Sequence, residues 1–137
     1  LNTTNDVHNA YFDVTQYACD AKSIYPQKCV LRLSDIAFAK ICTKEAECRE
    51  AQIRYLKIIE DIEKTPELLA TLTAYLLDYE SNVSNTAKAL CCHLNTVKYR
   101  LNAIRDHTGY SPSKPTDAYP LLIAVAINRM KNSEDGV

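Results

Sequence analysis

Two short amphipathic patterns, joined by a few residues within positions 82–109, constrain the fold more than any other part of the chain. In the second pattern, apolar residues follow the spacing of one buried helical stripe, at Leu94, Val97, Leu101 and Ile104. The other side of this helix carries basic, amide and hydroxyl side chains. A short helix, a tight turn and a helix with an apolar back and a basic front are typical of a helix-turn-helix. The second helix of such a motif is the one that enters a DNA major groove.

Capping signals predict where the two motif helices begin and end. We expect Ser84 to cap the first helix, because a hydroxyl at this position can accept a hydrogen bond from a free backbone N–H. After a turn at residues 91–94, Asn95 is a suitable N-cap for the second helix, which we expect over about residues 95–108. Gly109 is expected to end that helix in the left-handed conformation.

Upstream of the motif, the first helix is expected over residues 5–23. Its apolar residues repeat at alternating steps of four and three, at Val7, Tyr11, Val14, Ala18 and Ala21. Residues 29–33 then form a short β-favouring run without a partner strand in this chain. Since a lone strand cannot satisfy its backbone, the run pairs outside the chain or with a second copy, or it is not a strand.

Three further helices are expected before the motif. The first is capped at residues 34–35 and ends near Cys42, and a longer one covers residues 44–64. Thr65 and Pro66 break that helix and begin the next, with Thr65 as N-cap and Pro66 at the first helical position. This break is our predicted domain boundary.

The last helix follows a Pro/Ser loop at residues 110–116. We expect Thr116 or Asp117 to cap it and the helix to run to about Met130. Pro120 then has to lie in its first turn, where a missing backbone N–H costs little. The fold class expected from the whole pattern is mainly α, a helix-turn-helix bundle preceded by a helical segment with at most one short strand.

Charge is distributed unevenly along a chain of 137 residues whose formal net charge is −1. Residues 84–107 carry four basic side chains against one acidic side chain, whereas residues 43–80 carry five against nine. A basic segment beside an acidic one suits a protein that places one face on a polyanion, although ordinary surface scatter is the alternative.

Composition argues against a metal site, a membrane span and a signal peptide. None of the six cysteines forms a CxxC pair, and the histidines do not complete a zinc spacing, so we expect reduced thiols in a cytoplasmic protein and no metal. No apolar run approaches the roughly 18 residues of a membrane span, and no membrane partner is expected. The start at Leu1 lacks signal-peptide character and leads us to expect a fragment of a longer protein.

The residues expected to contact DNA lie at the start of the second motif helix and beside it. Asn, Arg and Lys side chains read base edges, and basic or hydroxyl groups bind phosphates. The candidates of these types are His93, Asn95, Thr96, Lys98, Tyr99, Arg100, Arg105 and, on the first motif helix, Lys88. We expect Arg105, two turns along the helix, to reach only the DNA backbone.

Each main candidate has a structural alternative. Asn95 can serve only as a helix cap, and His93 can be a turn residue without a ligand. The ring of Tyr99 can pack against the first motif helix. Lys98 and Arg100 can simply form a solvated face.

A long run of residues beginning at His93, HLNTVKYRL, with Ile104 and Thr108-Gly109 after it, resembles the C-terminal helix-turn-helix domain of the PucR/CdaR family. The resemblance extends over about residues 67–130 and includes the patterns LLATL and TAKAL that precede the turn. Members of this family are bacterial transcriptional regulators. The motif is also similar to the DNA-binding end of the nucleoid protein Fis, which implies a major-groove helix starting near Asn95.

Residues 1–64 resemble, more weakly, the end of the GGDEF-like domain that precedes this module in the family. The resemblance therefore divides the chain into a regulatory or dimerisation remnant at residues 1–64 and a DNA-binding domain at residues 65–137. An effector site, if present, is expected upstream of this chain.

Together these observations predict sequence-specific binding of double-stranded promoter DNA by a homodimeric transcriptional regulator, without a cofactor. The sequence leaves open whether the regulator is an activator or a repressor. The alternative is a protein-interaction module that uses the same basic helix face. We do not expect an enzyme, because no nucleophile–base pair or paired carboxylates are visible and two glycines cannot build a phosphate-binding loop.

Overall fold

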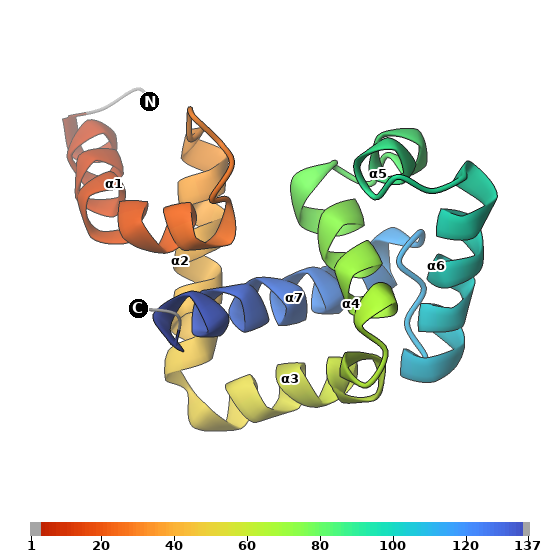
Figure 1. Ribbon diagram of the computed structural model, residues 1–137. Helices are drawn as coiled ribbons and strands as arrows, with labels where there is room; N and C mark the ends of the chain where they lie inside the picture. The colour runs from red at the N-terminus through yellow and green to blue at the C-terminus, as the bar shows by residue number, and fades with distance from the viewer. Residues whose placement is uncertain (1–3, 136–137) are drawn as a thin grey trace.

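The computed structural model describes residues 4–135, and these residues form helices joined by short turns (Figure 1). Seven α-helices and one π-helical turn follow one another within that range: α1 (Thr4–Ile24), α2 (Leu33–Glu47), α3 (Arg49–Glu63), α4 (Pro66–Thr73), η1 (Ala74–Asp78), α5 (Val83–Ala89), α6 (Leu94–Thr108) and α7 (Pro115–Asp135). No strand occurs among these described residues. The predicted helical fold class is therefore confirmed.

Helix α7 is the centre of the structure. Its middle is buried on nearly all sides, as expected for a helix that is apolar around its whole circumference; the buried residues are Leu121, Ile123, Ala124, Val125, Ala126 and Ile127. It packs against α1, α2, α3 and α4, and α3 runs alongside it. Figure 1 shows α1 and α2 at one end of α7 and the pair α5 and α6 beyond the other end.

Helix α1 has the predicted extent, and its apolar stripe is only partly buried. The stripe is buried at Ala21, near the C-terminal end of the helix, together with Tyr17 and Ile24. In the first half of the helix, Val7 and Tyr11 are exposed, because no described element covers them. The apolar stripe is therefore covered near the C-terminal end of α1 and exposed in its first half.

Residues 29–33 do not form a strand. They make bends and extended backbone, with Val30 exposed, before α2 begins at Leu33. Arg32 is the N-cap of α2, and its backbone N–H donates to Oδ2 of Asp35 at 2.9 Å. Of the three alternatives, the structure thus supports the one in which this run is not a strand.

The predicted helix over residues 44–64 is in fact two helices. Helix α2 continues past Cys42 to Glu47, and α3 begins at Arg49. Between them Cys48 has extended dihedral angles, φ −82° and ψ 110°, and its side chain is exposed. The chain changes direction here because α2 packs mainly against α1 whereas α3 packs mainly against α7.

The predicted break at Thr65 and Pro66 is confirmed. Thr65 has an extended conformation and Pro66 occupies the first position of α4, although the Thr65 side chain makes no capping hydrogen bond. The helical segment continues beyond Thr73 to Asp78, but its last turn is π-helical, with the N–H of Tyr79 donating to the carbonyl of Ala74 at 2.9 Å. Two left-handed residues follow, Glu80 and Ser81, with φ values of 48° and 62°.

Helix α7 begins earlier than predicted. Pro115 is its first residue, and the carbonyl of Lys114 accepts from the N–H groups of Asp117 and Ala118 at 3.0 and 2.8 Å. Pro120 therefore lies in the second turn, inside the helix, and the prediction of a first-turn position was wrong. Pro115, which was expected to lie in the preceding loop, instead meets the preference for proline at a helix start.

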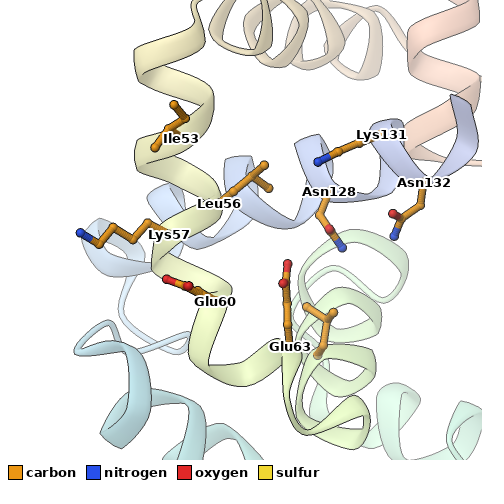
Figure 2. Close-up of a pocket in the computed structure, with 9 residues that line it drawn as sticks. Ile53, Leu56, Lys57, Glu60, Glu63, Asn128, Lys131 and Asn132 are labelled. Carbon is orange, nitrogen blue, oxygen red and sulfur yellow. The ribbon is translucent and has the colours of Figure 1, made fainter. Parts of the chain in front are cut away.

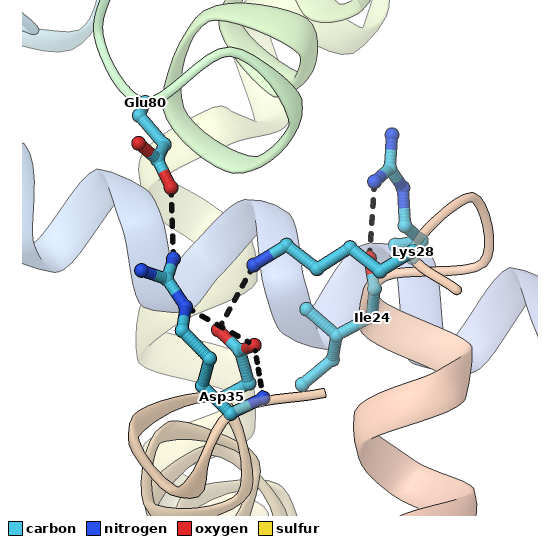
Figure 3. A network of polar contacts seen from close by, with 6 residues as sticks. Ile24, Lys28, Asp35 and Glu80 are labelled. Carbon is cyan, nitrogen blue, oxygen red and sulfur yellow. Dashed lines mark hydrogen bonds and ion pairs between the residues drawn. The ribbon is translucent and has the colours of Figure 1, made fainter. Parts of the chain in front are cut away.

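Polar contacts connect the N-terminal helices to the segment that leads into α5 (Figure 3). Lys28 lies 3.0 Å from the buried carboxylate of Asp35, and Arg32 lies 2.9 Å from Glu80. The Arg32–Glu80 contact brings the loop before α2 against the turn after η1.

Candidate nucleic-acid interface

The first motif helix, α5, is capped by Asn82 rather than by Ser84. Oδ1 of Asn82 accepts from the N–H of Asn85 at 2.9 Å, and its carbonyl accepts from the hydroxyl of Thr86 at 2.8 Å. Ser84 is exposed inside the first turn. Several cap-capable residues are adjacent here, and the helix begins one residue before Ser84, so the predicted cap was two residues late.

The second motif helix, α6, is capped by His93 rather than by Asn95. The imidazole Nδ1 of His93 accepts from the N–H of Asn95 at 3.0 Å. The expected cap role of Asn95 is thus corrected, and its side chain is left exposed within the first turn of the helix. Because Nδ1 is an acceptor in this bond, His93 carries its proton on Nε2 when neutral.

The buried side of α6 is the predicted one. Val97, Leu101 and Ile104 are at most 5% exposed, and the helix packs against α3, α4 and α5. Gly109 ends the helix with φ 79°, as predicted from its freedom to adopt the left-handed conformation. The turn before the helix includes a second left-handed residue, Cys91, with φ 53°.

The outer side of α6 presents polar and aromatic groups to solvent. Asn95, Lys98 and Tyr99 are exposed, and Tyr99 is 74% exposed, so its ring does not pack against α5. Thr96 is half-buried, and Lys88 is exposed on α5. Helical spacing aligns Asn95 and Tyr99 with Asn102, an exposed amide absent from the predicted set although it lies seven residues after Asn95.

The two arginines of α6 have different partners. Arg100 is half-buried, and its Nη1 lies 3.3 Å from the hydroxyl of Thr71 on α4, so this guanidinium is held against the neighbouring helix. Arg105 is exposed and forms an ion pair with Asp106 at 3.5 Å. Unpaired positive charge on the exposed side is therefore concentrated at Lys98, near the start of the helix.

A hollow lies elsewhere, between α3, α4 and α7 (Figure 2). It has a volume of about 700 Å³, and its charged residues balance, with Lys57 and Lys131 beside Glu60 and Glu63. No residue of α5 or α6 lines it. None of the helices within residues 4–135 combines the length and the apolar character that spanning a membrane requires.

Comparison with known proteins agrees with the predicted resemblance for the second half of the chain. Residues 68–127 match the family described as the PucR C-terminal helix-turn-helix domain, which here comprises α4 to α6 with the adjoining part of α7. The expected GGDEF-like character of residues 1–64 is not supported. No solved structure matches the chain.

Curated relatives share part of this chain. Uncharacterized proteins of Mycobacterium bovis and of two strains of Mycobacterium tuberculosis are each 43% identical to it over 65 residues. The match covers 47% of this chain and 16% of each relative. The chain thus spans about a sixth of the length of these relatives.

Proposed function

We propose that this chain is the DNA-binding part of a transcriptional regulator and that α6 binds in the major groove of double-stranded DNA. The observation that carries the proposal is the division of α6 into a fully buried side and an exposed side with Asn95, Lys98 and Tyr99. The match of residues 68–127 to a helix-turn-helix family supports it.

The exposed groups have distinct roles in this proposal. Asn95 and Asn102 offer amides to adenine edges, and the Tyr99 ring between them offers an apolar contact to thymine methyl groups. Lys98 and Lys88 bind phosphates on either side of the groove. Thr96 and Nε2 of His93, at the start of the helix, donate hydrogen bonds to the DNA backbone. Arg105 binds a DNA phosphate only when its ion pair with Asp106 is broken.

Arg100 acts mainly by holding α6 against α4. Its hydrogen bond to Thr71 fixes the adjoining side of α6. The exposed residues of α6 that are proposed to contact bases therefore keep one orientation. Arg100 is therefore a positioning residue in this proposal, and a variant of it does not separate DNA contact from support of the helix.

The proposed activity is binding without catalysis or cofactor, in the cytoplasm. One module makes few base contacts, and we therefore propose that two copies bind half-sites about 34 Å apart as a homodimer. Residues 1–64 serve as the regulatory and dimerisation region and residues 65–137 as the DNA-binding domain, with any effector site on a preceding part of a longer protein.

Fluorescence anisotropy on promoter-derived and random duplexes at several salt concentrations tests the proposal. We expect affinity to fall steeply with salt, and Lys98→Ala to weaken binding and to reduce the logarithmic salt slope by about one. Lys131→Ala removes an equal charge from the far end of α7 and is the matched control. Equal effects of the two variants, or no binding at low salt by a folded sample, would favour the protein-interaction alternative.

A further inference from the structure

The hollow between α3, α4 and α7 has no part in the proposed DNA binding, because no residue of α5 or α6 lines it. Its volume of about 700 Å³ falls within the roughly 300–1,000 Å³ of typical ligand pockets. A second hollow of about 480 Å³ adjoins it and shares Glu63, Leu69, Asn128 and Asn132 with it. The space suits a small organic molecule rather than a single ion.

Part of the hollow is lined by aliphatic side chains from two helices. Ile53 and Leu56 come from α3, and Leu69 comes from α4. Ile53 is exposed, and Leu56 and Leu69 are half-buried. An apolar group of a ligand that covered these side chains would remove aliphatic surface from water on both partners, which favours binding.

Polar side chains converge on the same space. Figure 2 shows the carboxylate of Glu63 on α3 directed toward Asn128 on α7, with the amide of Asn132 turned to the same side. Asn128 and Asn132 are four residues apart, so they share one face of α7. Lys131 also lines the hollow, whereas Lys57 points away from these groups (Figure 2).

These polar groups are available to a ligand. Within residues 4–135, the side chains of Glu63, Asn128, Lys131 and Asn132 take part in no hydrogen bond or ion pair. The adjacent Arg129 differs from them, because its guanidinium is bonded to Asp78 and to the carbonyl of Ile24. The lining thus offers one carboxylate, one ammonium group and two amides.

The set of groups is complementary to a peptide with free ends. A side-chain amide has a donor and an acceptor, as a peptide group does, so Asn128 and Asn132 can each pair with a peptide group. Glu63 can accept from a terminal ammonium group, and Lys131 can donate to a terminal carboxylate, in charge-assisted hydrogen bonds. A ligand with only one of these charges would leave the other charged group of the hollow without a partner.

We propose that this hollow binds a short zwitterionic peptide, of two or three residues, with apolar side chains. Its amino end lies against Glu63, its carboxylate against Lys131 and its peptide groups against the two asparagines. Its side chains cover Leu56 and Leu69. This binding is separate from the proposed DNA binding and does not depend on it.

Titration of the isotope-labelled 137-residue chain with L-leucyl-L-leucine, followed by ¹H–¹⁵N correlation spectra, tests the site. We expect saturable shifts at residues that line the hollow. N-acetylation or C-terminal amidation of the dipeptide should each weaken binding by on the order of 10-fold, because each removes one charged contact. Glycylglycine, which has both charges but no apolar side chain, should bind more weakly than either.

Variants of the chain assign each end of the peptide to its residue. Glu63→Gln should weaken binding of the free dipeptide and abolish its advantage over the N-acetylated form, since the two changes remove the same contact. Lys131→Met should do the same for the amidated form. Glu50→Gln, at an exposed position near the start of α3 and outside the hollow, is the matched control and should bind like the unchanged chain. The same spectra show whether each variant is folded.

Three outcomes overturn the inference. One is the absence of saturable shifts at millimolar dipeptide, and another is equal affinity for the free, acetylated and amidated forms. The third is a Glu63→Gln chain that still distinguishes the free from the acetylated dipeptide. Since no DNA is present, failure here leaves the proposed function untouched, and failure of DNA binding leaves this site untouched.

Discussion

Arg129 on α7 and Asp78 in η1 form a two-pronged ion pair, with Nη1 2.7 Å from Oδ1 and Nη2 2.9 Å from Oδ2. Nη1 of the same guanidinium also donates to the carbonyl of Ile24, the last residue of α1, at 3.0 Å. One side chain thus connects the central helix, the π-helical turn and the C-terminal end of α1. A charged donor at that end also satisfies a carbonyl without a partner in the helix.

Replacing Arg129 should destabilise the fold clearly. We expect Arg129→Met to lower the free energy of unfolding by about 2–3 kcal/mol, because it leaves a partly buried carboxylate and a carbonyl without their donor. Urea denaturation measures the effect. Lys131→Met, at an exposed position two residues further along α7, is the control and should cost less than about 0.5 kcal/mol; a similar loss in both variants would contradict the assigned role.

Asp35 should make stability depend on acid pH. Burial alone would raise the pKa of this carboxyl, but the Arg32 N–H and the Lys28 ammonium together outweigh burial and hold the pKa below its usual value. On acidification the unfolded chain therefore takes up the proton first, so the stabilisation is present at neutral pH and is lost as the pH falls through the lower, folded-state pKa.

Asp35→Asn tests this dependence and should lower the free energy of unfolding by about 1–2 kcal/mol at pH 7. Urea midpoints at pH 7, 4 and 2.5 should show the difference from the unchanged chain narrowing only below the unfolded-state pKa of 3.8. Asp61→Asn removes an exposed carboxylate paired with Lys64 and should show little difference at any pH. A gap for Asp35→Asn that stays constant from pH 7 to 2.5 would argue against this carboxylate as the source.

The His93 cap should be replaceable by another cap residue. Thermal unfolding should show a loss of about 1 kcal/mol for His93→Ala, since the N–H of Asn95 loses its acceptor, and a smaller loss for His93→Asn. Ser84→Ala, at the position wrongly expected to cap α5, should have almost no effect. Equal losses for the alanine and asparagine variants of His93 would show that the ring contributes something other than the cap.

Cys42 should be the unreactive thiol of the chain. Burial, and secondarily the nearby carboxylate of Glu45, raises the pKa of its thiol to about 12, so it holds almost no thiolate at pH 8. A thiol-disulfide reagent at pH 8 should modify Cys19, Cys29, Cys48 and Cys91 rapidly and Cys42 only after denaturation. Cys42→Ala should lack the denaturation-dependent thiol; rapid modification of Cys42 in the folded chain would refute its assignment as buried.

The features that could be predicted from sequence are those with a strong local cause. Gly109 adopts a conformation that other residues avoid, and Pro66 can begin a helix but not continue one, so both ends were placed correctly. The buried stripe of α6 was also predicted, because Val97 and Leu101 lie on a helix whose other side is polar. The DNA contacts assigned to the exposed residues remain predictions.

Other features depend on competition or on distant packing, which local sequence does not reveal. Asn82, Ser84 and Asn85 can all cap a helix, and only the backbone geometry selects Asn82. The break at Cys48 has no proline or glycine and arises from the different partners of α2 and α3. Periodicity similarly identifies a stripe on α1 but not how much of it is covered.

The π-helical turn at Ala74–Asp78 has a consequence for the direction of everything after it. With one residue more than an α-helical turn, it shifts the phase of the following chain by about 100° relative to an uninterrupted α-helix. This added rotation brings the carboxylate of Asp78 opposite Arg129. It also sets the direction in which the chain leaves η1 toward α5. Deleting one residue from this turn would therefore rotate Asp78 away from Arg129 and change the direction in which the chain leaves toward α5.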